Sequence, residues 1–215
     1  MILAIYCAGG LGREVIALAR SVNRWEAIVF VDDVTEQREV AGARVFKFQE
    51  VEEYKGNIEF VIANGEPEAR ESLYHKIKLA GYPMGNIIGN GCCILPETEI
   101  GEGCIIYDCG ISANVRIGCN TLINTRVIIG HDTIVGANCV LSCGCFIGGV
   151  TQIKDKVYIA PGALIKDRVC IAQSAIISLG AVILRSVREK AIMVGNPARK
   201  IGYNTLGKVF NIFDE

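Results

Sequence analysis

The sequence predicts a protein of two architectures, a small parallel α/β sheet of Rossmann type followed by a parallel β-helix. Strands and helices alternate in the first part of the chain, which is the pattern of a parallel sheet. From Ile88 onward an aliphatic residue returns every six positions, whereas an amphipathic helix repeats at three and four and a half-buried strand at two. We expect a Rossmann-like domain at 1–84, the β-helix at 85–193 and a C-terminal cap at 194–215.

The Rossmann-like part begins with an apolar strand at 2–7, which runs into the glycine turn AGGLG at 8–12 and into helical spacing over 13–20. A second strand at 27–31 ends on Asp32 and Asp33, and a third at 59–63 ends on Asn64 and Gly65. A helix over 67–80 has proline near its first turn, a position that helices favour for proline. Residues 82–85, with the sequence YPMG, are the expected joint between the two parts.

The repeat places its large aliphatic residue at 94, 100 and 106, steps once by five to 111, and then keeps a spacing of six up to 183. Four positions after most of these comes a small or β-branched residue. We expect each hexad to form one short strand and its turn, and three hexads to form a triangular coil with the aliphatic residues at its inner corners and the small residues on its flats. Glycine often follows the aliphatic residue, which suits a crowded turn or a positive φ. We expect the tail through Phe210 and Phe213 to cap the open coil end.

The composition, the charge and the N-terminal sequence exclude several classes of protein. The 215 residues are 51% hydrophobic with a mean hydropathy of +0.35, which excludes a natively unfolded chain. Because 22 basic residues meet 23 acidic ones without a basic run, we expect no nucleic acid partner. The N-terminal apolar run meets glycine after eight residues and lacks a basic start, so we expect a cytoplasmic protein with no membrane insertion.

Ten cysteines at scattered spacings predict reduced thiols that serve as small apolar side chains, because no secretion signal accompanies them. Cys139, Cys143 and Cys145 match no zinc motif, and two of them fall on the inward position of the repeat, so we expect no metal. A β-helical carbonic anhydrase needs three histidines on facing coils, whereas the repeat region contains one. That enzyme class is excluded.

Two groups of residues suggest chemistry. The glycine turn exposes backbone N–H groups at a helix N-terminus, where a phosphate or carboxylate can bind, and Asp32 and Asp33 stand at a strand end where a ribose or base can be bound. A solvated turn with a helix-capping aspartate explains the same residues. His131, two places after Ile129, is expected to face outward with Asp132 beside it. This pair suits a general base, and an ordinary surface histidine is the alternative.

Basic residues gather near the end of the repeat, within 187–190 and at Arg199 and Lys200. They suit the phosphates of a nucleotide such as coenzyme A, and they suit a solvated surface equally well.

Four strings taken in order resemble one family: YCAGGLGRE at 6–14, FVDD at 30–33, IGHD at 129–132 and VGNPARK at 194–200. The chain resembles the hexapeptide-repeat sugar acetyltransferases of the sialic-acid O-acetyltransferase and bacillosamine N-acetyltransferase group. The resemblance covers the whole chain. It implies a left-handed β-helix, a homotrimer with active sites between subunits, and acetyl transfer from acetyl-CoA to a sugar or to a UDP-linked 4-amino-sugar.

The resemblance also implies roles for individual residues. His131 matches the family's general base and Asp132 the acidic residue behind it. Contacts to the sugar nucleotide are implied for Gly9, Gly10, Leu11, Asp32, Asp33 and Gly65, and the lining of the acetyl-CoA groove for Gly149, Pro161, Leu179 and Gly180. Leu11 departs from the family, which often has histidine there. Val140 stands where the bacillosamine enzyme has a second histidine near the cofactor.

We therefore expect direct acetyl transfer with His131 as the base, and N-acetylation of a UDP-linked 4-amino-sugar, because the two aspartates suit a ribose or uracil. The alternatives are O-acetylation of sialic acid or another sugar hydroxyl, an acyltransferase of the same fold that acts on an amino acid such as serine, a cysteine nucleophile such as Cys143, and a non-catalytic trimeric scaffold that binds a nucleotide.

Overall fold

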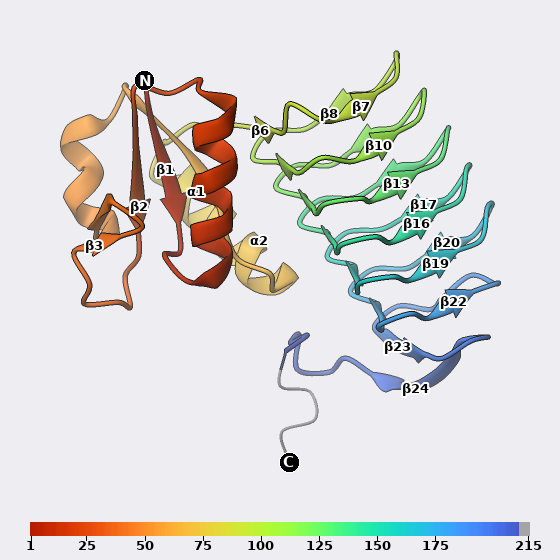
Figure 1. Cartoon of the computed structure of the whole chain (residues 1–215). Helices are drawn as coiled ribbons and strands as arrows, with labels where there is room; N and C mark the ends of the chain where they lie inside the picture. The colour runs from red at the N-terminus through yellow and green to blue at the C-terminus, as the bar shows by residue number, and fades with distance from the viewer. Residues whose placement is uncertain (211–215) are drawn as a thin grey trace.

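The computed structural model describes residues 1–210 and contains both predicted architectures, which lie side by side (Figure 1). The α/β part contains β1 (Ile2–Tyr6), α1 (Gly10–Val22), β2 (Ala27–Val31), β3 (Glu39–Val40), β4 (Ala43–Phe46), the 3-10 helix η1 (Phe48–Tyr54), β5 (Ile58–Ile62) and α2 (Pro67–Leu79). A left-handed parallel β-helix follows. The fold class predicted from the sequence is confirmed.

The α/β sheet has the strand order β3-β4-β2-β1-β5. β1 pairs in parallel with β2 on one side and β5 on the other, and β4 continues in parallel beyond β2. The order of strands reverses between β1 and β5, and open α/β sheets bind ligands at the carboxyl ends of the strands beside such a switch point. The fold thereby brings the loops after β1 and β5 to one place.

The sequence analysis did not predict β3, β4 or η1. β3 and β4 form an antiparallel hairpin with only two paired positions, and the run over 39–46 is too short and mixed to show a strand period.

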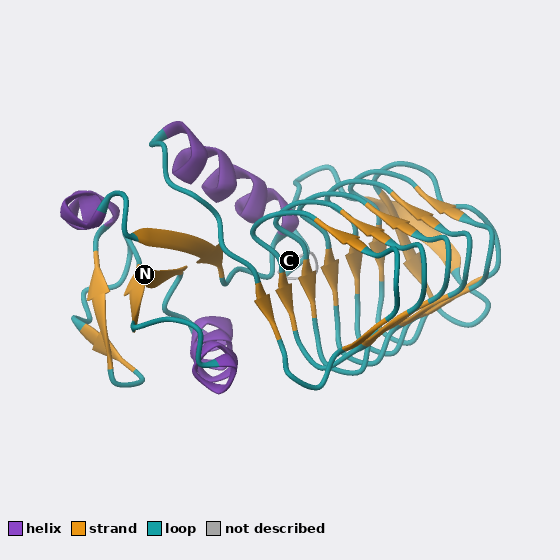
Figure 2. Ribbon diagram, turned by 90° about the horizontal axis from the view of Figure 1, so that it is seen from above, coloured by secondary structure: helices purple, strands orange, loops and turns teal. Residues whose placement is uncertain are grey.

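The strands of the β-helix stack into three rows, which form three faces of a triangular prism (Figure 2). Face 1 holds β6 (Ile87–Ile88), β9 (Ile105–Ile106), β12 (Leu122–Ile123), β15 (Val140–Leu141), β18 (Tyr158–Ile159), β21 (Ile176–Ile177), β23 (Ala191–Val194) and the antiparallel β24 (Arg199–Tyr203). Face 2 holds β7 (Cys93–Ile94), β10 (Gly110–Ile111), β13 (Ile128–Ile129), β16 (Phe146–Ile147), β19 (Leu164–Ile165) and β22 (Val182–Ile183). Face 3 holds β8 (Glu99–Ile100), β11 (Arg116–Ile117), β14 (Ile134–Val135), β17 (Gln152–Ile153) and β20 (Cys170–Ile171).

The large aliphatic residue of each hexad is the second residue of a strand, and its side chain fills the inside of the prism. Ile129, for example, is fully buried and pairs in register with Ile111 and Ile147. The single five-residue step is absorbed in a turn, because Ile111 still pairs with Ile94. The prediction that these residues occupy inner corners is wrong: the turns at the corners are formed by the two residues after the glycine position.

Glycine follows the aliphatic residue because of a close approach between coils. A Cβ at Gly130 would lie 2.5 Å from the backbone nitrogen of Gly149, and one at Gly148 would lie 2.4 Å from that of Asp167. The positive φ falls two residues later, as at Asp132 with φ 57°. Crowding therefore selects the glycine, whereas the left-handed corner position is occupied by Asn, Asp or Gly at some turns and by residues such as Arg, Lys and Val at others.

Face 1 carries the α/β part. The outward side chains of several of its coils, such as Leu122 and Val140, are buried in one cluster with the apolar side of α1. We call this interface between the α/β part and face 1 the seam, and its buried apolar residues the seam cluster. Arg70 of α2 is fully buried in the same seam, where its guanidinium donates to the carbonyl oxygens of Asn120 and Ile62 at 2.7 and 2.6 Å. Its hydrogen-bond acceptors are neutral carbonyl oxygens, and burial lowers the pKa of Arg70 to about 10. These contacts fix the sheet on the coil.

The C-terminal residues follow a different course from the expected cap. β24 extends the sheet of face 1, but Phe210 then packs against Tyr158 of face 1, with ring centroids 5.7 Å apart, rather than over the coil end. Phe213 lies outside the described residues. Neither helix within residues 1–210 combines the length and the apolar composition that crossing a membrane requires.

Candidate active site

The first group of predicted residues lies at the switch point of the α/β sheet. Gly9 is the N-cap of α1, Gly10 begins the helix, and both are exposed. A Cβ at Gly12 would lie 2.3 Å from the carbonyl oxygen of Cys7, so this glycine lets the helix start close to the end of β1. Leu11 is half-buried and packs against the seam cluster. The turn therefore presents free backbone at a helix N-terminus, which is suited to an anion.

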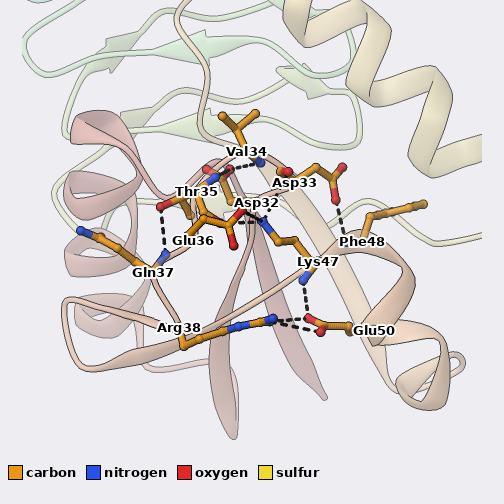
Figure 3. Close-up of polar contacts among 10 residues, drawn as sticks. All are labelled: Asp32, Asp33, Val34, Thr35, Glu36, Gln37, Arg38, Lys47, Phe48 and Glu50. Atoms are coloured by element: carbon orange, nitrogen blue, oxygen red, sulfur yellow. Dashed lines mark hydrogen bonds and ion pairs between the residues drawn. The ribbon is translucent and has the colours of Figure 1, made fainter.

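Asp32 holds the loop after β2 in place (Figure 3). One carboxylate oxygen accepts from the backbone N–H of Ala8 at 2.9 Å, and the other from those of Val34 and Thr35 at 2.9 and 3.0 Å. Partial burial opposes ionisation, but these donors outweigh it and hold the pKa of Asp32 below its ordinary value. Asp32 therefore ties the loop after β2 to the loop after β1 as a carboxylate.

Asp33 belongs to a separate polar cluster with Tyr6 and Lys76. Its carboxylate accepts from the hydroxyl of Tyr6, from Nζ of Lys76 at 2.6 Å and from the backbone N–H of Phe48 at 2.9 Å. Partial burial opposes ionisation of Asp33, but these donors outweigh it and lower its pKa to about 2. Burial and the neighbouring carboxylate raise the pKa of Tyr6. The sequence analysis missed Tyr6 and Lys76, which come from a strand end and from α2.

Gly65, after β5, lies beneath the ring of Phe210. A Cβ at Gly65 would lie 3.2 Å from a ring carbon of Phe210. The carboxylate of the next residue, Glu66, accepts from the backbone N–H groups of Val209 and Phe210 at 2.7 and 2.8 Å. The C-terminal segment is thus attached to the switch point.

The second group of residues lies on the corner between faces 2 and 3. Nδ1 of His131 lies 2.6 Å from one carboxylate oxygen of Asp132, whose other oxygen accepts from Nδ2 of Asn114 at 2.6 Å. Hydrogen bonds from His131 and Asn114 hold the pKa of Asp132 below its ordinary value. Since a carboxylate only accepts, it assigns the proton to Nδ1 and leaves Nε2 free to take a proton.

Asn114 was missed by the sequence analysis, although the repeat contains the signal. It precedes Asp132 by eighteen residues, which is one full coil, and both residues adopt a positive φ at the same corner. Residues one coil apart stack in a β-helix, so the coil length alone places Asn114 beneath the pair.

Gly149 lies directly beside the histidine. A Cβ there would lie 2.9 Å from Nε2 of His131 and 3.1 Å from two ring carbons. The backbone carbonyl of His131 accepts from the N–H of Val150 at 2.8 Å, so neighbouring coils hold the loop. The side chain of His131 is nevertheless 65% exposed. A fixed, accessible imidazole with an open nitrogen is the arrangement that a general base requires.

The remaining predicted cofactor residues lie on the corner between faces 1 and 2. Pro161 and Leu179 line an apolar cavity of about 570 Å³ together with Tyr158 and Phe210. Gly180 adopts a positive φ at the same corner, and Leu179 is 72% exposed. Val140 lies elsewhere, because it is 2% exposed in the seam under the α/β part.

A single chain does not bring all of these residues together. The sheet switch point and the corner with Pro161 and Leu179 lie beside face 1, whereas His131 and Gly149 lie on the corner opposite that face.

Cys143 is exposed, while Cys139 and Cys145 are buried inside the coil. Within residues 1–210, no three side chains of His, Cys, Asp or Glu are grouped as metal ligands. Arg199 and Lys200 line a separate cavity of about 450 Å³ with Arg185 at the last coil.

Comparison with protein families gives two matches. Residues 2–77 match the PglD N-terminal domain, and residues 114–149 match the bacterial transferase hexapeptide of six repeats. Among curated proteins, no sequence matches the chain.

Solved structures resemble almost the whole chain. WeeI from Acinetobacter baumannii AYE is 29% identical with a TM-score of 0.88, over 94% of this chain and 100% of that one. The acetyltransferase domain of PglB from Neisseria gonorrhoeae FA1090, in complex with acetyl coenzyme A, is 25% identical with a TM-score of 0.88, over 93% and 98%. A mutant of perosamine N-acetyltransferase from Caulobacter crescentus, in complex with CoA and GDP-perosamine, shares the fold at 24% identity and a TM-score of 0.88, over 94% and 97%. These matches confirm the resemblance to hexapeptide-repeat sugar acetyltransferases that was expected from the sequence.

Proposed function

We propose that the chain, which matches the PglD N-terminal domain and the bacterial transferase hexapeptide, transfers acetyl from acetyl-CoA to the amino group of a nucleotide-linked sugar. The observation that carries the proposal is the pair of His131 and Asp132, 2.6 Å apart, on an exposed corner beside Gly149. The related structures that hold acetyl coenzyme A or CoA with GDP-perosamine support the choice of substrates.

In the proposed mechanism, Nε2 of His131 takes a proton from the sugar amine as its nitrogen attacks the thioester carbonyl. Asp132 stabilises the imidazolium that forms, and a backbone N–H of the adjacent coil holds the developing oxyanion. The bond between the carbonyl carbon and sulfur then breaks, and the imidazolium returns the proton to the leaving thiolate. The products are the N-acetylated sugar and free CoA, so no acyl-enzyme is required.

The switch point of the sheet is the proposed place of the nucleotide. The free backbone of Gly9 and Gly10 suits the diphosphate, and Asp32 and Asp33 border the same edge of the sheet. Both carboxylates already accept protein N–H or O–H donors, so we expect them to contact the nucleoside through lone pairs that remain.

We further propose that three chains form a trimer whose active sites lie between subunits. Face 2 exposes a row of apolar side chains one coil apart: Ile128, Phe146 and Leu164 are each 44–46% exposed. Face 2 is bordered by both functional corners. Burying it in a trimer brings the His131 corner of one chain to the Leu179 corner of its neighbour, which joins the two groups that one chain keeps apart.

Subunit complementation tests the shared site. His131→Ala and Leu179→Glu change exposed side chains on different corners, so each variant is expected to fold and to lose activity alone. In randomly mixed trimers, about a quarter of the sites are expected to be active. An active site needs a Leu179→Glu chain that supplies the intact His131 corner and a neighbouring His131→Ala chain that supplies the intact Leu179 corner. Two inactive variants that stay inactive when mixed would place each site within one chain.

The general-base role has its own test. His131→Ala is expected to lower kcat by at least about a hundred-fold, the usual contribution of a general base, with an unchanged melting temperature because the side chain is exposed. Full activity in this variant would remove His131 from the mechanism.

A further inference from the structure

The C-terminal segment over 206–210 crosses from the end of the coil to the switch point of the α/β sheet. It follows β24, the last strand of face 1, and reaches the N-terminus of α2, more than 140 residues away in sequence. A terminal segment needs no such crossing to complete the coil. Its contacts on the sheet therefore require a separate explanation.

The contacts are few and specific. Both oxygens of the Glu66 carboxylate accept backbone N–H groups, from Val209 at 2.7 Å and from Phe210 at 2.8 Å. Because the acceptor is charged, these are hydrogen bonds of the stronger kind. Phe210 places its ring over Gly65 and edge-on to Tyr158, at an interplanar angle of 80°. The segment is therefore fastened at one carboxylate.

The position of the ring conflicts with ligand binding. Gly65 lies in the loop after β5 at the switch point, where the sugar nucleotide is expected, yet a ring carbon of Phe210 lies only 3.2 Å from the place of a Cβ on Gly65. Because this distance is shorter than an ordinary van der Waals contact, even a methyl group on Gly65 would crowd the ring. No ligand atom can therefore fit between Gly65 and the ring of Phe210. The ring and a ligand that contacts Gly65 exclude each other.

The segment is also built to be displaced. Phe210 is 51% exposed and Leu206 is 77% exposed, so Val209, which is half-buried against the cluster between the sheet and face 1, is the apolar side chain of the segment with the most shielded position. Gly207 adopts a φ of 67°, where a Cβ would lie 2.9 Å from a side-chain carbon of Glu68. The closed state therefore depends on the two hydrogen bonds, on the contacts of the Phe210 ring with Gly65 and Tyr158, and on the packing of Val209.

We propose that residues 206–210 form a latch over the sugar-nucleotide site, fastened by Glu66 and closed by Phe210, and that the nucleotide must open it to bind. The proposal rests on the function proposed above, which places the nucleotide at the switch point of the sheet, where Gly65 is a sugar-nucleotide contact implied by the family resemblance. Glu66 and Phe210 are thereby positioning residues of this site. They set the apparent affinity for the nucleotide, since only the fraction of molecules with an open latch can bind.

Two variants weaken the latch in different ways. Phe210→Ala removes the ring over Gly65, and Glu66→Gln keeps the size of the side chain but leaves one oxygen for two N–H donors. Leu206→Ala is the matched control, because it truncates an exposed side chain of the same segment that does not contact Gly65. We expect both latch variants to bind UDP or GDP roughly tenfold more tightly in a calorimetric titration, whereas the control keeps the wild-type Kd.

Hydrogen exchange of the wild-type chain reads the latch directly. The amides of Val209 and Phe210 are expected to exchange faster when the preferred nucleotide, UDP or GDP, is saturating. Slower exchange, or weaker nucleotide binding by Phe210→Ala, would show that the segment is a wall of the site and would overturn the latch. Equal Kd values for all four proteins would overturn it while leaving the proposed function intact. Absence of nucleotide binding in every protein would remove both.

Discussion

Replacing Gly149 with alanine tests the proposed catalytic corner at His131 without removing a polar side chain. The new methyl group would stand 2.9 Å from Nε2 of His131 and 3.1 Å from two carbons of its ring. No backbone atom is among these contacts, and the ring is the exposed end of a side chain. The imidazole therefore moves aside while the coil remains as it is.

The size of the effect follows from these distances. Ordinary contacts begin near 3.4 Å, so the reactive nitrogen itself must retreat by about 0.5 Å. Any such movement also pulls on the 2.6 Å contact with Asp132. Since a displacement of about 1 Å at a catalytic group costs roughly a hundred-fold in rate, we expect kcat to fall by about ten- to a hundred-fold.

Two other glycines serve as controls. Gly130→Ala would place its Cβ 2.5 Å from the backbone nitrogen of Gly149, so it should lower the melting temperature, because backbone cannot move aside. Gly202→Ala meets nothing within 4 Å and should change neither property. Activity is measured as acetyl-CoA-dependent product formation and stability by thermal unfolding. A Gly149→Ala variant with wild-type kcat would refute the role assigned to this corner.

Three further predictions follow from single contacts. Asp132→Asn removes the charge that stabilises the imidazolium of His131, so kcat should fall at least tenfold with unchanged thermal unfolding; an unchanged kcat would contradict this. Arg70→Met leaves the carbonyl oxygens of Asn120 and its neighbours buried without donors, so urea unfolding should show a loss of about 3–5 kcal/mol, and a loss below about 1 kcal/mol would contradict the seam described above. Asp33 has a pKa of about 2 when folded against 3.8 ordinarily, so its ionised form stabilises the fold above pH 4 and that contribution disappears as pH falls toward 2. The free energy of unfolding of Asp33→Asn should therefore vary less with pH across this window than that of wild type, and equal slopes would count against the prediction.

The fold was predictable because its signals are periodic. A six-residue repeat has one structural solution, and the structure keeps the register even across the shortened step from Ile106 to Ile111. The hairpin of β3 and β4 was not predictable, since strands of two and four residues are too short to show a period. The placement of the large residues was mispredicted because the sequence shows which residues point inward but not where the corners lie.

The candidate site was predictable only in its parts. His131 and Asp132 are adjacent in sequence, and the glycine turn and strand ends follow from the α/β pattern. Tyr6 and Lys76 were missed because seventy residues separate them: the pairing of β1 with β2 brings Tyr6 to Asp33, and the packing of α2 beside β5 brings Lys76 there. No local pattern predicts the course of a terminal segment, so the contact of Phe210 with Gly65 could not be predicted from the sequence either.

The central claim is acetyl transfer to a nucleotide-linked amino sugar by His131. The most direct measurement is mass spectrometry of products formed from acetyl-CoA with a panel of UDP- and GDP-linked 4-amino-sugars, sialic acid and serine, with His131→Ala assayed alongside. Mass detection avoids thiol reagents, which the ten cysteines would consume. We expect one acetylated nucleotide sugar from the wild-type chain and none above background from the variant. Acetylation of sialic acid or serine alone, an undiminished product from the variant, or no product from any acceptor would contradict it.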